Sequence, residues 1–492
     1  MDGADQLNRY RRTDMTRLAA VRRFRRRRRP TAPRRAVVVV TALAGIALLG
    51  TGWAGAAGWF GGAVAGAPGG SQQPGPSSST AVAVASPTIA PTVPSGSPAS
   101  SASPAPTLPV PADPRAVLEA RLQATLDRVR VKLGVPGASV TILFPDGTAW
   151  SGVSGLADVA AKAPVTPDTA FAFASMSKTF TSAVVLELVA EGRLRLSDSA
   201  AGLVPPGLPI TLDRRITVAM LLDHTSGLAD FFLNPKIDAA LQRARSRTWT
   251  ASDALRFVGK RLSPPGNAWH YANTNYLLLG LIVERITGRP LAAEIRDRFL
   301  TPLALGSTWY QAVEDPRTSL AHGYRLVGTK VTAKPIDLAD GTGVAPFRSV
   351  VTAAGGAGSM AGTSGDLARW ARELYGGDVL GPTGTGLLLS DFNKTTGYLP
   401  GVSYGYGVQA LSIDGHPSLG HSGRLIGFRG AVRHFPIEGV TIAVLTNQSR
   451  ADPGAIVRAL LKVVVPPPAP PASPASPASP SPGTSTSPSP SA

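Results

Sequence analysis

Residues 173–179 read FASMSKT, and this stretch decides how the rest of the chain is interpreted. It places Ser175 and Lys178 three positions apart, and residues at that spacing share one face of a helix. A serine hydroxyl is a weak nucleophile until a base takes its proton, and a lysine among apolar neighbours can have its pKa lowered enough to act as that base. The pattern predicts a nucleophile, Ser175, and a base, Lys178. The alternative is an N-cap serine beside a lysine that reaches solvent, because S-x-x-K is short enough to arise by chance.

A second motif, Tyr271-Ala-Asn273, follows the turn-forming residues 264–266 and precedes an apolar helix predicted over 276–286. A phenol near a cation can exchange protons with a nucleophile or a leaving group. An asparagine side chain offers both a donor and an acceptor to a substrate amide. Tyr271 is therefore a catalytic candidate and Asn273 a substrate-binding candidate. The alternative is a buried tyrosine that is hydrogen-bonded at a helix start.

The third motif is Gly-His421-Ser422-Gly423-Arg424, near the end of a predicted strand. A strand edge beside the nucleophile can pair with a peptide-like substrate. Gly423 permits close backbone approach, and His421 can polarise the tyrosine of the second motif or help to bind a carboxylate. We take all four residues as substrate-binding candidates. The alternative is a loop histidine beside a glycine turn.

Strand patterns lie near both ends of the folded body and helical patterns lie between them. This arrangement predicts an α+β fold, in which one antiparallel sheet is assembled from both termini, flanked by helices, and interrupted by an inserted, mostly helical region. The predicted strands are 138–144, 148–153, 405–411, 427–435 and 440–447, and the predicted helices are 114–133, 179–191, 217–222, 275–287, 364–375 and 453–464.

The three motifs occur in the order found in the penicillin-recognising serine hydrolases, and the sequence resembles this family. Its members include class C β-lactamases, D-Ala-D-Ala carboxypeptidases and related esterases. The resemblance covers residues 114–462, and it implies the β-lactamase/transpeptidase-like fold. Further stretches that resemble this family are LLDHTSGL at 221–228, PLALGST at 302–308, AGGAG at 354–358 and GHSGRLIGF at 420–428.

The resemblance also implies roles for single residues. Ser175 would be the acyl-accepting nucleophile and Lys178 its base or proton relay. Tyr271 would be the second proton-transfer group, and Asn273 would hold the acyl amide of the substrate. The backbone N–H groups of Ser175 and Arg424 would form the oxyanion hole.

One departure from the family pattern bears on the substrate. His421 stands where most β-lactamases have lysine, and a neutral histidine offers less fixed charge to a carboxylate. Arg424 is the nearest candidate for the missing charge. We expect an acyl-enzyme hydrolase like the D-Ala-D-Ala carboxypeptidases, or a related peptidase or esterase, acting on a peptide-like or ester substrate that includes peptidoglycan fragments. The alternatives are a weak β-lactamase and a penicillin- or peptidoglycan-binding sensor without turnover.

The charge of the chain is concentrated at its start. Lys and Arg number 49 and Asp and Glu 31, a net charge of +18, and residues 1–35 contain 13 Arg and 3 Asp. Residues 36–60 are uncharged and apolar, and as a helix they would be roughly 37 Å long, enough to cross a bilayer. The basic flank predicts a cytoplasmic amino terminus and an external catalytic domain. A cleaved signal peptide, with a small-residue site at 65–67, is the alternative and implies secretion.

Composition divides the rest of the chain. Residues 61–112 form a Pro/Ser/Gly/Thr-rich linker, 113–465 the hydrolase domain, and 466–492 a Pro/Ala/Ser tail expected to be disordered. The absence of cysteine excludes disulfides, thiolate nucleophiles and sulfur-ligated metals. We expect no cofactor and no metal, because no H-E-x-x-H motif occurs, and no nucleic-acid partner, because the basic arm matches no recognisable nucleic-acid-binding fold. No G-x-S-x-G elbow occurs either. His224, His322 and Asp366 are interpreted as scaffold residues.

Overall fold

The computed structural model describes residues 113–326 and 335–465. The predicted basic arm, membrane span, linker and tail lie outside these residues. Within the described part of the chain, no helix is both long and apolar enough to cross a bilayer.

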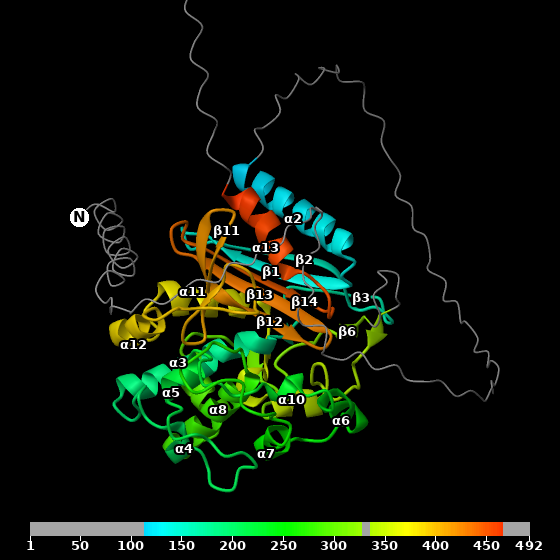
Figure 1. Ribbon diagram of the computed structural model, residues 1–492. Coiled ribbons are helices and arrows are strands. Elements are labelled where there is room, and N and C mark those ends of the chain that lie inside the picture. The colour runs from blue at the N-terminus through cyan, green and yellow to red at the C-terminus, as the bar shows by residue number, and fades with distance from the viewer. Residues whose placement is uncertain (1–112, 327–334, 466–492) are drawn as a thin grey trace, which may run out of the picture.

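A nine-stranded sheet forms the centre of the molecule, in the order β3-β2-β1-β14-β13-β12-β11-β10-β9 (Figure 1). The first strand pairs antiparallel with the last, with Ala138 opposite Thr446. The α+β prediction of one sheet built from both ends of the domain is therefore confirmed. The strands of this sheet are β1 (Gly137–Leu143), β2 (Ala149–Asp158), β3 (Ala163–Pro164), β9 (Asn393–Lys394), β10 (Ser403–Tyr404), β11 (Gln409–Ile413), β12 (His416–Leu425), β13 (Phe428–Phe435) and β14 (Val440–Thr446).

Two terminal helices, α2 (Pro114–Leu133) and α13 (Pro453–Val464), cover one face of the sheet (Figure 1). Both begin as their sequences dictate, with an aspartate N-cap followed by proline. Gly134 ends α2 in the left-handed conformation, with φ of 63°. Leu122 of α2 and Leu460 of α13 are completely buried in the core that these helices share with the sheet.

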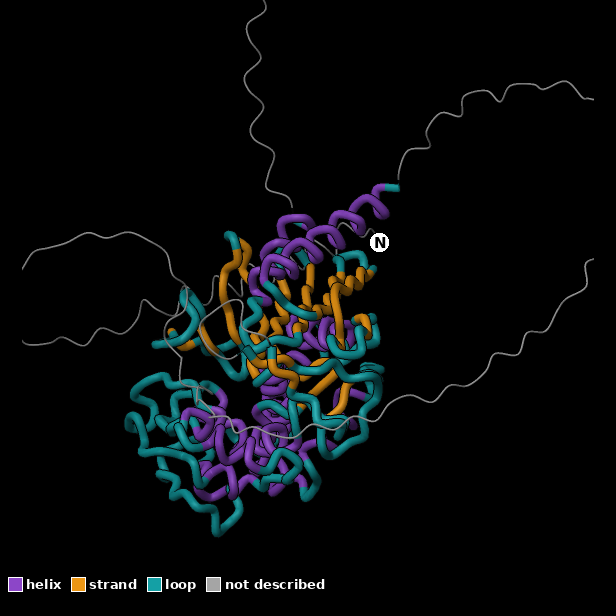
Figure 2. Tube along the Cα trace, turned by 90° about the vertical axis from the view of Figure 1, so that its right-hand side faces the viewer, coloured by secondary structure: helices purple, strands orange, loops and turns teal. Residues whose placement is uncertain are grey.

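The other face carries the inserted region, and Figure 2 shows its helices gathered on one side of the strands. A second, larger apolar core fills the space between this region and the sheet. The helical elements are η2 (Ala174–Met176), α3 (Ser177–Ala190), α4 (Ala200–Leu203), α5 (Val218–Leu222), η3 (Phe231–Leu233), α6 (Ile237–Arg243), α7 (Ala251–Leu255), α8 (Asn273–Thr287), α9 (Leu291–Ile295), η4 (Arg296–Leu300), α10 (Arg348–Ala354), η5 (Gly355–Ala357), α11 (Ser364–Gly376) and α12 (Gly381–Leu388).

The remaining described strands form two small sheets, one of three strands and one of two. The ribbon β4 (Phe171–Ala172), β8 (Met360–Gly362) and β5 (Thr308–Tyr310) leads directly into η2. The strand β6 (Tyr324–Arg325) pairs antiparallel with β7 (Ile336–Asp337).

The third motif lies within β12, a strand whose bounds were not predicted from the sequence. The prediction of one strand over 405–411 was wrong in its bounds, because Gly407 has φ of 80° and interrupts it. A tight turn at 414–415, where both residues have positive φ, instead folds β11 back onto β12. All of 420–424 therefore lies in a strand and not at a loop.

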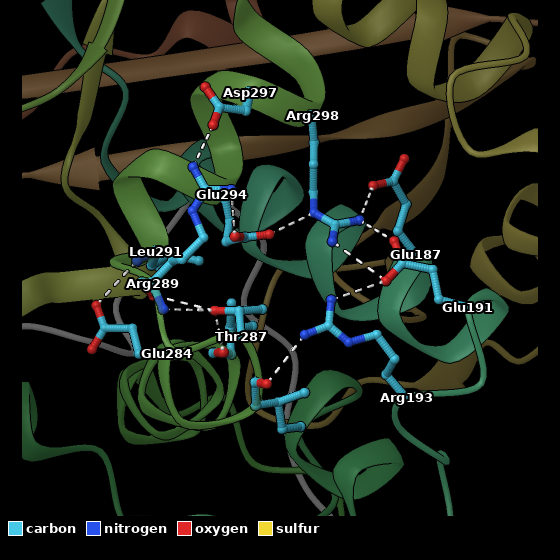
Figure 3. Close-up of polar contacts among 12 residues, drawn as sticks. Glu187, Glu191, Arg193, Glu284, Thr287, Arg289, Leu291, Glu294, Asp297 and Arg298 are labelled. Atoms are coloured by element: carbon cyan, nitrogen blue, oxygen red, sulfur yellow. Dashed lines mark hydrogen bonds and ion pairs between the residues drawn. The ribbon is translucent and has the colours of Figure 1, made fainter.

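An ion-pair network anchors the far end of α3 to the helical region (Figure 3). Arg298 contacts three carboxylates: Glu187 at 2.7 Å, Glu294 at 2.7 Å, and Glu191. Arg289 shares Glu294 at 3.0 Å. Because Glu187 belongs to α3 and Arg298 to η4, the network fixes the position of the helix that follows the candidate nucleophile.

Candidate active site

Ser175 lies in the tight turn η2, immediately before α3. Ala174 has φ of 51°, a strained conformation for a residue other than glycine. Backbone contacts hold the turn in place: the Phe173 N–H donates to the carbonyl of Met360 at 2.9 Å. The close approach of β12 also requires a glycine, since a Cβ at Gly423 would lie 2.4 Å from the Phe173 carbonyl oxygen. Gly423 therefore lets β12 lie directly against the turn that carries Ser175, and its role in substrate binding stays a prediction.

Lys178 is completely buried, and its amine contacts three oxygens. Its Nζ lies 3.1 Å from Ser175 Oγ, 2.7 Å from Asn273 Oδ1 and 2.8 Å from the Ala357 carbonyl. Burial lowers the pKa of Lys178 to about 7, although the charge of Asp230 opposes the shift. A neutral amine has two N–H donors and one lone pair. Because the Asn273 and Ala357 oxygens can only accept, they take the two donors, and the lone pair faces the Ser175 hydroxyl.

Asp230 is a site residue that sequence reasoning missed. Its carboxylate accepts from Asn273 Nδ2 at 2.8 Å and from the Phe232 N–H at 3.0 Å. Burial raises the pKa of Asp230 to about 6, and the nearby Lys178 charge opposes that change. The contact orients Asn273 so that its carbonyl faces the lysine. A lone aspartate in the apolar run LADFF gave no signal that the fold brings it to this amine.

Asp230→Asn is expected to move the acidic limb of the pH–rate profile to lower pH. Lys178 acts as a base only when neutral, so acylation in the wild type should rise with pH through about 7. The carboxylate of Asp230 raises the pKa of Lys178, so its removal lets that pKa fall. The measurement is kcat/KM against pH for an ester or amide substrate. Asp213→Asn, at a partly exposed aspartate that pairs with Arg215 and Arg261 outside the cleft, serves as control, and a limb that stays in place or moves upward contradicts this coupling.

Tyr271 lies over the lysine, with Lys178 Nζ 5.0 Å from its ring centroid. Its hydroxyl is buried and has no hydrogen-bond partner among the described residues. Burial raises the pKa of Tyr271 well above its usual value, and the Tyr398 ring acts in the same direction. The Ser175 hydroxyl has the opposite, smaller effect. Tyr271 is thus a neutral phenol beside the nucleophile, able to donate or relay a proton but a poor base.

His421 is completely buried and is turned away from the expected partner. Its Nδ1 lies 2.6 Å from the Ser422 carbonyl and its Nε2 2.9 Å from the Tyr404 hydroxyl. The carbonyl only accepts, so Nδ1 carries the proton and Nε2 accepts from Tyr404. Burial lowers the pKa of His421 to about 3. The expectation that His421 itself polarises Tyr271 or binds a carboxylate is therefore wrong in its geometry, because both ring nitrogens are occupied and the ring is neutral.

The outer edge of β12 is not paired with β11 beyond Gly420, because β11 begins at Gln409, the residue opposite Gly420. Pairing between the two strands covers only His416–Gly420 of β12, and the next outward group, the Ser422 N–H, donates to Gln409 Oε1 at 3.0 Å. Strand alternation places the Arg424 N–H on this same edge. Arg424, an exposed side chain, also lines a small cleft together with Ser175 and Asn273. The three motifs therefore meet at one cleft beside an open strand edge. A wider hollow, between 210–216 and 258–261, shares no residue with this cleft.

The three residues interpreted as scaffold have structural contacts. His224 is buried, and its Nδ1 accepts from the Ala272 N–H at 3.3 Å and from Asn275 Nδ2 at 2.9 Å. Its Nε2 has no partner among the described residues, so the backbone satisfies only one of its nitrogens. His322 pairs with Asp337 at 2.9 Å, and Asp366 accepts from the Ser307 N–H at 2.8 Å.

Comparisons with known proteins agree with this arrangement. The profile of a family described as Beta-lactamase matches residues 118–465. Penicillin-binding protein 4 of Amycolatopsis lactamdurans is 31% identical over 344 residues, which cover 67% of this chain and 85% of that protein. A D-stereospecific amidohydrolase from a Streptomyces species superimposes with a TM-score of 0.60 at 27% identity, covering 69% of this chain and 98% of that chain. The D-amino acid amidase of Ochrobactrum anthropi SV3 shares the fold, with a TM-score of 0.61 at 24% identity, covering 71% and 98% of the two chains.

Proposed function

This chain belongs to the β-lactamase family, the serine hydrolases of the penicillin-binding protein fold, and we propose that it hydrolyses D-configured peptides or amides through an acyl-enzyme on Ser175. A single observation carries the proposal: the amine of a completely buried lysine, whose pKa burial lowers to about 7, lies 3.1 Å from a serine hydroxyl. Near neutral pH such an amine can take the serine proton as the new bond forms.

The proposed acylation uses the groups of the cleft in sequence. Lys178 takes the Ser175 proton, and Oγ bonds to the substrate carbonyl carbon. The N–H groups of Ser175 and Arg424 stabilise the resulting oxyanion. The C–N bond then breaks, and the lysine proton passes to the leaving amine with Tyr271 as relay. Water later hydrolyses the ester on Ser175 and regenerates the free hydroxyl.

The substrate class rests on the neighbours and on the third motif. The names of the Streptomyces amidohydrolase and of penicillin-binding protein 4 point to D-stereospecific amide chemistry and to penicillin recognition in those proteins. In this chain the neutral His421 supplies no charge to the cleft. That supports a carboxypeptidase-like or amidase activity over an efficient β-lactamase.

The test is mass spectrometry of the full-length protein, with turnover assays, across four substrates: a D-Ala-D-Ala peptide, a D-amino acid amide, a penicillin and a short-chain ester. An adduct that maps to the peptide containing Ser175, with turnover of the D-peptide or D-amide, supports the proposal. A penicillin adduct stable for hours without turnover of any substrate supports a sensor. No adduct on Ser175 with any substrate contradicts acyl transfer.

We also propose that the domain works outside the cell, tethered through residues 61–112 to a span at 36–60. The support is the sequence pattern together with the position of two helices. The described part of the chain begins close to the start of α2 and ends close to the end of α13. Both helices lie on the sheet face opposite the inserted helical region (Figure 1). Attachment there leaves the cleft free to reach a substrate.

A further inference from the structure

A buried histidine outside the three motifs lies against the candidate relay Tyr271. His224 is completely buried, and its ring packs on the Tyr271 ring with the centroids 4.3 Å apart. Its φ of 66° lies in the left-handed region, an uncommon conformation for a residue other than glycine. A strained backbone of this kind persists only where the surrounding contacts hold it. The proposed acylation gives His224 no part, so these contacts call for an explanation.

His224 is hydrogen-bonded to the backbone on both sides of Tyr271. Its carbonyl accepts from the His270 N–H at 2.9 Å, and its Nδ1 accepts from the Ala272 N–H at 3.3 Å. These two N–H groups belong to the residues directly before and after the tyrosine. A single residue therefore holds the second motif where the phenol leaves the chain, with its carbonyl on one side and its ring on the other.

A chain of directed hydrogen bonds fixes the tautomer of this ring. The Leu228 N–H donates to Ser226 Oγ at 3.2 Å, and Ser226 donates to Asn275 Oδ1 at 2.7 Å. The amide of Asn275 then presents Nδ2 to His224 Nδ1 at 2.9 Å. Because Nδ1 accepts from groups that can only donate, the proton is on Nε2. Burial lowers the pKa of His224 well below its ordinary value, and the Lys178 charge acts in the same direction, so the ring is neutral.

Packing holds the Tyr271 side chain, because its hydroxyl has no hydrogen-bond partner among the described residues. Besides contacting His224, the ring stacks on Tyr398, with centroids 5.3 Å apart and planes 11° apart. A hydroxyl without a partner of its own can exchange protons with a substrate and a lysine. Its position then depends on the neighbours of its ring and of its backbone, and His224 contacts both.

We propose that His224 is a positioning residue, which holds Tyr271 where its hydroxyl can pass a proton from Lys178 to the leaving amine. The inference rests on the proposed function and deepens it. The hydroxyl accepts the proton that Lys178 took from Ser175 and gives its own to the leaving nitrogen as the C–N bond breaks, while His224 neither gains nor loses a proton. A misplacement of about 1 Å in such an arrangement can cost about 10²-fold in rate.

The test compares two leaving groups on one acyl group: the D-configured amide that the wild type hydrolyses and the p-nitrophenyl ester of the same acid. An amine must be protonated to leave, whereas p-nitrophenolate is a stable anion and leaves without a proton. A relay is therefore needed for the amide and not for the ester. Damage to the fold, to Ser175 or to Lys178 lowers both substrates, so the ratio of kcat/KM for amide over ester reports the relay alone.

His224→Asn in the full-length protein is the decisive variant. Asparagine adopts the left-handed conformation more readily than most residues, and its amide oxygen can accept from the Ala272 N–H in place of Nδ1. The ring that packs on Tyr271 is lost. We expect kcat/KM for the amide to fall by about 30-fold and that for the ester by no more than about 3-fold, so the ratio falls by about 10-fold.

A second variant acts on the histidine from outside. Asn275→Asp keeps the shape of the side chain and still accepts from Ser226, but it cannot donate. It draws the imidazole proton onto Nδ1, which then no longer accepts from the Ala272 N–H. The amide-over-ester ratio should fall here as well, although the ring of His224 is retained.

Tyr271→Phe provides the reference, and it should lower the ratio by about 10²-fold. The double variant His224→Asn/Tyr271→Phe should hydrolyse the amide no more slowly than Tyr271→Phe, because the place of an absent hydroxyl no longer matters. His434→Asn is the matched control. It removes another buried histidine, on β13, whose Nδ1 lies 2.9 Å from Thr441 Oγ1, and it should leave the ratio unchanged. Thermal unfolding of every variant checks the fold.

The outcomes distinguish this inference from the proposed function. If folded His224→Asn and Asn275→Asp lower both substrates equally, or neither, the positioning role is refuted while acyl transfer through Ser175 stands. A fully additive loss in the double variant also refutes it, because His224 would then act on something other than Tyr271. If the wild type forms no acyl-enzyme with either substrate, the inference and the proposed function are refuted together.

Discussion

Replacing Ser175 by alanine is expected to abolish the acyl-enzyme and to lower kcat/KM by about 10⁴-fold to 10⁶-fold, the range in which loss of a serine nucleophile falls. The residual rate would come from binding and from the backbone N–H groups, which the substitution leaves in place. The fold should tolerate the change, because Ser175 is only partly buried and its hydroxyl contacts the amine of Lys178, which keeps its other partners Asn273 and Ala357.

Intact-protein mass spectrometry with a penicillin and a D-amino acid amide measures the first part of this expectation, and steady-state kinetics the second. Ser246→Ala, at an exposed serine, is the matched control and should acylate like the wild type. Undiminished turnover by Ser175→Ala would falsify the assignment of the nucleophile.

Lys178→Met should be nearly as severe, with a loss of about 10³-fold to 10⁵-fold in the acylation rate, because no other group in the described site can take the Ser175 proton. Tyr271 is a neutral phenol whose pKa burial raises further, and His421 has both nitrogens engaged. Methionine has nearly the same length as lysine and an apolar character suited to a completely buried position.

The measurement is single-turnover acylation across pH, with Lys236→Met as the exposed control. The wild-type rate should rise through pH 7 as Lys178 loses its proton, whereas the residual rate of the variant should show no step there. The double variant Ser175→Ala/Lys178→Met should lose little beyond the Ser175→Ala value, since the two side chains act as one unit. A clearly additive loss, or a surviving step at pH 7 in Lys178→Met, would assign the base to another residue.

The amino-acid sequence by itself determined the architecture, because the signals for it are local. The helix α2 begins at the Asp113-Pro114 pair and ends at Gly134, and the closing helix begins at Asp452-Pro453 in the same way. The spacing of Ser175 and Lys178 fixed their contact as well, since one helical turn carries both residues.

Only the tertiary structure decided what surrounds that pair. Asp230 lies 43 residues before Asn273 along the chain and carries no local pattern, yet the packing of α8 brings it to the site. The direction of His421 was also undecidable from its motif, because the partner of its ring is Tyr404, on a strand two places away in the sheet. Local spacing sets which neighbours share a face, whereas the burial that lowers the pKa of Lys178 and the contact that orients Asn273 arise from segments that meet only when the chain folds.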